Sequence, residues 1–222
     1  MNFALDTGAS LTIISPNVDD DGFLDDVSGI DIHNKLATIS ICNLKLLQLV
    51  DVDFKDIVVG KVAIPIDNVD GIIGRDLLKN FCVKIDNENK RILFSENSRL
   101  INKKGLEKQF NSSLNTIAMV LDPDSVRTDF LFDTGYVGEV SVDSLLFKLQ
   151  TKAEGCKKSW ETLDTGLFRD EKKFSSSVFF PLDFNLDTIT FKSVVCEYNE
   201  SIQKNIIGNA FMTRFKSIVL TI

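Results

Sequence analysis

The sequence contains three copies of the tripeptide Asp-Thr-Gly, beginning at Asp6, Asp133 and Asp164, and their aspartates are the candidate catalytic residues. A carboxylate can act as a general acid or base, and the glycine permits a tight turn beside it. His33 is the only histidine, so a Ser-His-Asp or Cys-His system would depend on that one residue. It lies in the polar stretch 31–35, where we expect a solvated loop side chain. If the chain is an enzyme, its carboxylates carry the chemistry.

Two of the three copies belong to an internal repeat. An apolar run precedes both Asp6 and Asp133, and each copy is followed by an apolar-apolar-Gly motif, Ile72-Ile73-Gly74 or Ile206-Ile207-Gly208. The interval from Asp to Gly is 68 residues (74 − 6) in the first half and 75 (208 − 133) in the second. Two motifs in the same order at nearly equal spacing indicate a duplication. We therefore expect two homologous lobes, residues 1–110 and 111–222.

The elements that must position these motifs are mostly strands. Short apolar stretches punctuated by Asp, Asn, Gly and Pro predict strands at Leu36–Ile41, Ile57–Ile66, Cys82–Ile85, Arg91–Phe94, Thr116–Leu121, Val178–Leu182, Ile189–Val195 and Ser217–Ile222. Short helices are expected at Arg75–Phe81, Val142–Leu149 and Asn209–Phe215. The clearest hairpin is Lys84–Ile92, which has a polar turn. Residues 96–113, rich in Asn, Ser, Lys and Glu, indicate a linker between the halves of a mainly β protein.

An Asp-Thr-Gly after an apolar strand, paired with the apolar-apolar-Gly motif, resembles the active-site elements of the retropepsin-like and pepsin-like aspartic peptidases. The resemblance covers nearly the whole chain. It implies the acid-protease fold in its single-chain form: two retropepsin-like β-barrel lobes with short helices and an active site at their interface. The active site would then contain Asp6 and Asp133.

The same resemblance implies roles for the residues beside the two aspartates. Gly8 and Gly135 let the two loops approach, and the hydroxyls of Thr7 and Thr134 bond across to the backbone of the other loop. Ser10 keeps the family's hydroxyl that bonds the catalytic carboxylate, whereas the second lobe has Val137 there.

The chemistry follows from two like charges held close together. Both carboxylates cannot ionise easily, so one keeps a proton while the other acts as base on a shared water. The water attacks a peptide carbonyl and the protonated partner stabilises the oxyanion, so the chain is expected to be an endopeptidase that needs no metal or cofactor. With Ser10 on one side and Val137 on the other, we expect Asp133 to hold the proton and Asp6 to ionise more readily.

The third Asp-Thr-Gly copy has a different context. No apolar strand precedes Asp164, which lies only 44 residues (208 − 164) before Gly208. We interpret this copy as part of the second lobe's flap, the hairpin that covers the substrate. The flap residues would be Trp160, Asp164, Thr165 and Gly166.

Composition limits the partners. The net charge is −7 and no Lys/Arg cluster is present, which argues against nucleic acid as a partner. No apolar run is long enough for a membrane span and no signal peptide begins the chain, so we expect a soluble monomer with pseudo-two-fold symmetry, of unknown compartment, that acts on peptide or protein substrates. We expect buried free thiols at Cys42, Cys82, Cys156 and Cys196. The first lobe lacks an opening strand before Asp6, as if truncated, processed or completed from elsewhere.

Two other classes of protein remain open. A catalytically weak or inactive peptidase-like module would bind extended peptides between the lobes without cutting them. A structural protein is the third option, and an open cleft would count against it. The presence of both aspartates favours the enzyme.

Overall fold

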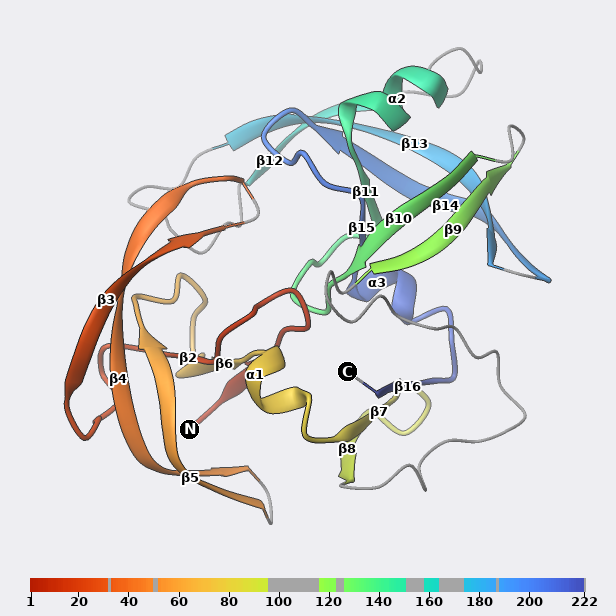
Figure 1. The fold of residues 1–222 in the computed structure, drawn as a ribbon. Coiled ribbons are helices and arrows are strands. Elements are labelled where there is room, and N and C mark those ends of the chain that lie inside the picture. The colour runs from red at the N-terminus through yellow and green to blue at the C-terminus, as the bar shows by residue number, and fades with distance from the viewer. Residues whose placement is uncertain are drawn as a thin grey trace.

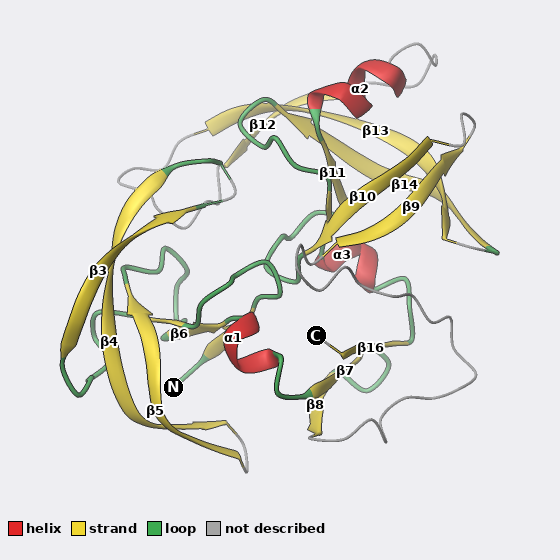
Figure 2. Cartoon of the chain, viewed as in Figure 1, coloured by secondary structure: helices red, strands yellow, loops and turns green. Residues whose placement is uncertain are grey.

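The computed structural model describes residues 1–31, 33–49, 52–95, 116–122, 126–150, 158–163, 174–186 and 188–221. We refer to residues 1–95 as the N-terminal half and to residues 116–221 as the C-terminal half. The fold is mainly β, and its helices are short (Figure 2). The expected lobe boundary at residue 110 lies outside the described residues.

Six strands form the sheet of the N-terminal half (Figure 1). Their order is β3-β4-β5-β2-β6-β1, which places the short apolar strands beside one another. The strands are β1 (Phe3–Leu5), β2 (Ile13–Ile14), β3 (Phe23–Ile30), β4 (Leu36–Leu49), β5 (Val52–Lys61) and β6 (Gly71–Ile73).

Seven strands form the sheet of the C-terminal half, in the order β12-β13-β14-β11-β15-β10-β9. Strand β9 also pairs with β13, so the sheet closes on itself. The strands are β9 (Thr116–Asp122), β10 (Val126–Phe132), β11 (Val140–Val142), β12 (Lys158–Leu163), β13 (Phe174–Leu186), β14 (Ile189–Asn199) and β15 (Ile206–Ile207).

The two sheets repeat the same arrangement. The order β3-β4-β5-β2-β6-β1 corresponds to β12-β13-β14-β11-β15-β10, and every matching pair has the same direction. In both sheets the strand that leads into Asp-Thr-Gly pairs parallel with the strand of the apolar-apolar-Gly motif. A short helix follows each such motif, α1 (Arg75–Leu78) or α3 (Asn209–Met212). The remaining helix, α2 (Ser144–Gln150), follows β11.

The halves differ at the outer edge of the strand that leads into the Asp-Thr-Gly loop. In the C-terminal half β9 pairs antiparallel with β10 there. In the N-terminal half no strand among the described residues pairs with the outer edge of β1. A groove of about 330 Å³ lies at this edge, lined by residues that include Phe3 and Leu5 of β1 and Leu49 of β4.

A third sheet joins the two halves. Strand β16 (Ser217–Thr221), from the C-terminal half, pairs antiparallel with β7 (Cys82–Asp86), which in turn pairs with β8 (Arg91–Ser95). The turn after β7 adds to this junction, because Asn87 Nδ2 donates to the carbonyls of Met212 at 2.8 Å and Phe215 at 2.9 Å. The last strand therefore belongs to a sheet that begins in the first half.

One cluster of buried apolar side chains extends through both halves. In the C-terminal half it includes Phe130 and Phe184, both fully buried and packed edge to face with 5.8 Å between their ring centres. Cys42, Cys82 and Cys196 are buried free thiols, as expected, and burial raises the pKa of the Cys196 thiol. Cys156 lies outside the described residues.

Most expected elements are present, with shifted ends. The expected strand Ile57–Ile66 instead runs from Val52 to Lys61, and the helices expected at Arg75–Phe81 and Asn209–Phe215 end at Leu78 and Met212. The expected hairpin at Lys84–Ile92 is confirmed by the pairing of β7 with β8. Strand β3 was not predicted because its acidic sequence is almost entirely exposed. No described helix is long and apolar enough to cross a membrane.

We predict that Asn87→Ala lowers the free energy of unfolding by about 1–3 kcal/mol, because two carbonyls of the other half lose their donor. Urea unfolding measures the change. The matched control is Asn80→Ala, which removes a single side-chain bond from an exposed residue to Leu77 of its own half. Equal losses in the two variants would show that Asn87 does not fasten the halves together.

Candidate active site

The two Asp-Thr-Gly loops meet between the two sheets and are bonded to each other through their threonines. The Thr7 hydroxyl donates to the carbonyl of Phe132 and the Thr134 hydroxyl donates to the carbonyl of Leu5, both at 2.7 Å. In return, each hydroxyl accepts the backbone N–H of the other threonine, at 3.0 and 3.1 Å. The structure thus places Thr7 and Thr134 in the reciprocal contact that the resemblance implied.

Each glycine packs against the aspartate of the opposite loop. A Cβ atom on Gly8 would lie 2.5 Å from the Asp133 carboxyl carbon, and one on Gly135 would lie 2.6 Å from Asp6 Oδ2. Real Cβ atoms do not approach other atoms so closely, so only glycine allows the loops to come together at these two positions. The two loops therefore meet in one site, although their equivalent residues, such as Thr7 and Thr134, are 127 positions apart in the sequence.

The loops hold their own carboxylates in the same way. Asp6 Oδ1 accepts the N–H groups of Gly8 and Ala9, and Asp133 Oδ1 accepts those of Gly135 and Tyr136. These backbone N–H groups bond only one carboxylate oxygen of each aspartate. Because the two sets of hydrogen bonds are equivalent, they do not decide which aspartate carries the proton.

Burial decides where the proton lies. Asp133 is only 8 % exposed, whereas Asp6 is half-buried. Burial, together with the charge of Asp6 and a hydrogen bond that Asp133 donates to it, raises the pKa of Asp133 to about 8. The raised pKa therefore favours a proton on Asp133 at neutral pH.

The expected cause of this asymmetry was wrong. Ser10 is exposed, and within the described residues its hydroxyl makes no hydrogen bond with Asp6. Val137, at the matching position of the second loop, is 72 % exposed.

Tyr136 is a functional residue that sequence reasoning missed. It follows Gly135 where the first loop has Ala9, and its ring fills space beside Gly138 and Gly208. Its hydroxyl donates to Glu197 Oε2 on β14, and burial and the nearby carboxylate raise the pKa of the phenol. Tyr136 is thus a neutral donor that ties the second loop to the sheet behind it.

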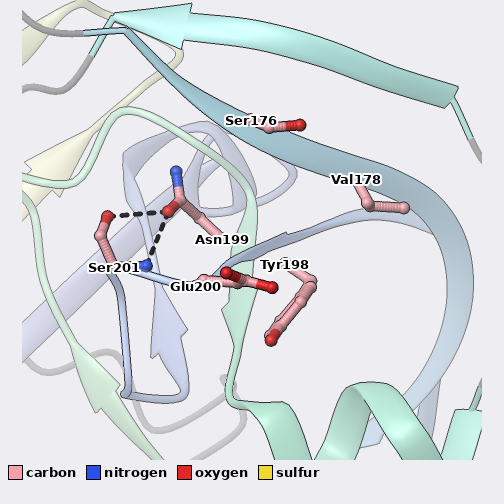
Figure 3. A pocket seen from close by; sticks show the side chains of 6 residues that line it. All are labelled: Ser176, Val178, Tyr198, Asn199, Glu200 and Ser201. Carbon is pink, nitrogen blue, oxygen red and sulfur yellow. Dashed lines mark hydrogen bonds between the residues drawn. The ribbon is translucent and has the colours of Figure 1, made fainter.

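A cavity of about 340 Å³ lies over the ends of β13 and β14 (Figure 3). Polar side chains and one aromatic ring line it: Ser176, Val178, Tyr198, Asn199, Glu200 and Ser201. Ser201 donates both its N–H and its hydroxyl to Asn199 Oδ1, at 2.9 and 2.7 Å. These two hydrogen bonds therefore fix Ser201 and Asn199 relative to each other in the wall of the cavity.

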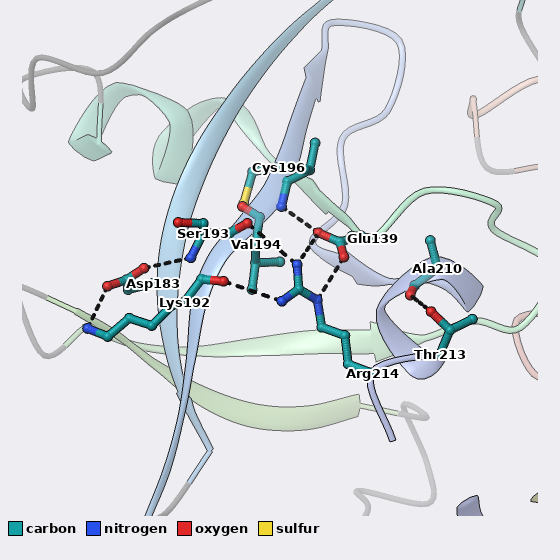
Figure 4. A network of polar contacts seen from close by, with 10 residues as sticks. Glu139, Asp183, Lys192, Ser193, Val194, Cys196, Ala210, Thr213 and Arg214 are labelled. Atoms are coloured by element: carbon teal, nitrogen blue, oxygen red, sulfur yellow. Dashed lines mark hydrogen bonds and ion pairs between the residues drawn. The ribbon is translucent and has the colours of Figure 1, made fainter. Parts of the chain in front are cut away.

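An ion pair fixes the end of the second active-site loop. Arg214, just after α3, binds Glu139 through two nitrogens at 2.7 and 2.9 Å, and Glu139 also accepts the N–H of Val195 on β14 (Figure 4). The first half has a hydrogen bond instead, from the Thr12 hydroxyl to the carboxylate of Asp76 in α1 at 2.7 Å. Each contact joins the loop to the helix after the apolar-apolar-Gly motif or to the residues that directly follow that helix.

The expected flap residues stay a prediction. Trp160 lies on β12, and Asp164, Thr165 and Gly166 fall outside the described residues. Within the described ranges, no cluster of three or more His, Cys, Asp or Glu side chains could hold a metal ion.

No protein-family model and no curated protein matches this chain. The geometry and the internal repeat are therefore what bear on its class.

We predict that Gly135→Ala and Gly8→Ala each destabilise the protein by about 1–3 kcal/mol, because the added Cβ pushes apart loops that are bonded through Thr7 and Thr134. Thermal and urea unfolding measure the loss. Ser10→Ala, beside the same loop but exposed, is the control and should change stability by less than about 0.5 kcal/mol. Wild-type stability in both glycine variants would contradict the close approach of the loops.

We predict that the proton on Asp133 makes stability depend on pH. The unfolded chain loses this proton near pH 3.8 and the folded chain near pH 8, so folding takes up a proton between these values. The free energy of unfolding should therefore fall as pH rises through this range, and it should fall less in Asp133→Asn. Urea unfolding at several pH values tests this, with Asp129→Asn on the exposed side of β10 as control. The same pH dependence in wild type and Asp133→Asn would refute the assignment of the proton.

Proposed function

We propose that the chain is an aspartic endopeptidase with a two-lobed, retropepsin-like fold, in which Asp6 and Asp133 activate a water molecule held between them. The observation that carries this proposal is the reciprocal packing of the two loops. Each glycine lies against the other loop's aspartate and each threonine bonds the other loop's backbone. A mere turn would not need a partner loop built in this way.

The repeated strand order supports the two-lobed assignment. Both sheets share the sequence of pairings that leads into the aspartate, and each carries a short helix after its apolar-apolar-Gly strand. Duplicated scaffolds that present one carboxylate each are a direct way to bring two like charges to a single point.

The geometry gives each aspartate a role in the proposed reaction. Asp6 is the charged base that removes a proton from the water as its oxygen attacks the peptide carbonyl. Asp133, which holds a proton up to about pH 8, donates a hydrogen bond to the carbonyl oxygen as negative charge develops there. Collapse of the tetrahedral intermediate returns a proton to the leaving amine, and the pair is restored.

A module that binds peptides without cutting them is the second candidate. It is favoured by one observation, the replacement of the small Ala9 by the bulky Tyr136 in the second loop, which makes the two loops unequal.

We predict that Asp6→Asn and Asp133→Asn each reduce peptide cleavage by at least about 100-fold, because each removes one half of the acid–base pair. The double variant should be little worse than either single variant, since the pair acts as a unit. Digestion of a peptide library, read by mass spectrometry, measures this, and circular dichroism checks that each variant folds. Asp129→Asn is the matched control.

Two results would separate the candidates. Substantial cleavage by either single variant would remove that aspartate from the mechanism. Peptide binding without cleavage in the wild type would favour the binding module.

A further inference from the structure

The β3–β4 hairpin reaches from the sheet of the N-terminal half toward that of the C-terminal half (Figure 1). At its tip, Asp31, His33, Asn34 and Lys35 are joined by hydrogen bonds in a turn. The buried Asp31 accepts the N–H groups of His33 and Lys35 on one carboxylate oxygen, each at 2.9 Å. Asn34 takes up a positive φ of 59°, which Asn tolerates better than most residues. The turn therefore presents His33 in a fixed direction.

His33 bonds to the other half of the molecule. Its Nδ1 lies 2.8 Å from the hydroxyl of Ser201, in the segment that joins β14 to Ile206 and the apolar-apolar-Gly motif. The side chain is half-buried and its Nε2 is shielded from solvent. The expectation of a solvated loop histidine was therefore wrong.

Neighbouring contacts fix the direction of this hydrogen bond. The Ser201 hydroxyl has one proton and donates it to Asn199 Oδ1 at 2.7 Å. The same oxygen accepts the Ser201 N–H, which excludes a flipped amide. Ser201 Oγ must then accept from His33, so His33 Nδ1 carries a hydrogen.

The contact continues inward to the active-site loop. Asn199 Nδ2 donates to the hydroxyl of Ser177 at 3.0 Å, which donates to Glu197 Oε1 at 2.5 Å. Glu197 also accepts the hydroxyl of Tyr136, the residue after Gly135. Hydrogen bonds that all point toward one carboxylate polarise and strengthen one another. Asn199 and Ser177 are 3 % and 0 % exposed, so this chain of contacts is an internal part of the second half.

We propose that His33 and Ser201 form a latch that holds the β3–β4 hairpin closed over a bound peptide. The chain of hydrogen bonds from Ser201 to Tyr136 fixes the position of Ser201 relative to the active-site loop. This role rests on the proposed function. Both residues are positioning residues, because they join the two halves away from the aspartates and touch no reacting atom.

The latch predicts different effects on KM and on kcat. An extended peptide that lies between the hairpin and the aspartate loops is retained by the closed hairpin, so losing the latch should weaken binding more than chemistry. One net hydrogen bond sets the scale, and KM should rise roughly 3- to 10-fold while kcat stays within about 2-fold.

A double-mutant cycle tests the pairing. His33→Ala and Ser201→Ala should each raise KM for a cleaved library peptide, and the double variant should be no worse than either single variant because both remove the same contact. Gln203→Ala, exposed in the same segment as Ser201, is the matched control and should leave KM unchanged. Additive effects, or an unchanged KM in His33→Ala, would overturn the latch.

Two further measurements keep the latch separate from the proposed activity. Nitrogen NMR of the only histidine should show the hydrogen on Nδ1, and Ser201→Ala should shift this signal while Gln203→Ala should not. In an Asp6→Asn background, which cannot cut, His33→Ala and Ser201→Ala should each raise the dissociation constant of the same library peptides. The double variant should raise it no further than either single variant. If His33→Ala and Ser201→Ala are coupled in peptide binding but the wild type cleaves no peptide, the latch stands and the peptidase is rejected. If the wild type cleaves peptides but the two substitutions are not coupled, the peptidase stands and the latch is rejected.

Discussion

The threonine contacts between the two Asp-Thr-Gly loops are the interaction on which the rest of the structure depends. Each loop has polar groups that find partners only in the other loop, so neither half satisfies its own backbone alone. A buried group without its partner costs about 1–3 kcal/mol, and several such groups are concentrated at this point. The halves are therefore complementary in hydrogen bonding as well as in shape, and their junction is the place where two carboxylates can be forced together.

That junction is symmetric in its backbone and asymmetric in its surroundings. Both carboxylates accept two N–H groups, yet only Asp133 is buried. Tyr136 and the Glu139–Arg214 ion pair belong to the second half alone. The second half thus encloses its aspartate more fully, and this burial raises the pKa of Asp133. The two halves differ in these side chains although their strand order is the same.

The repeat allowed much of this arrangement to be predicted from the sequence. A pair of motifs at matched spacing indicated which residues follow equivalent strands, and the structure brings Thr7, Gly8, Thr134 and Gly135 together. Contacts that no repeat encodes were not predictable. His33 and Ser201 are 168 positions apart, and neither stands in a periodic pattern. Strand β3 lacked an apolar face, and the role given to Ser10 depended on a side-chain direction that composition cannot show.

The pairing of β16 with β7 bears on how the chain is made. Ser217 pairs with Asp86, so this sheet joins segments that are synthesised far apart in time. Closing so long a loop is entropically costly, and contacts of this kind slow folding. The first half can form its own sheet as it leaves the ribosome, but it cannot acquire its final neighbour until residue 221 has emerged. During synthesis the edge of β7 is consequently open to other strands, and this interval is when a folding chaperone would have most to protect.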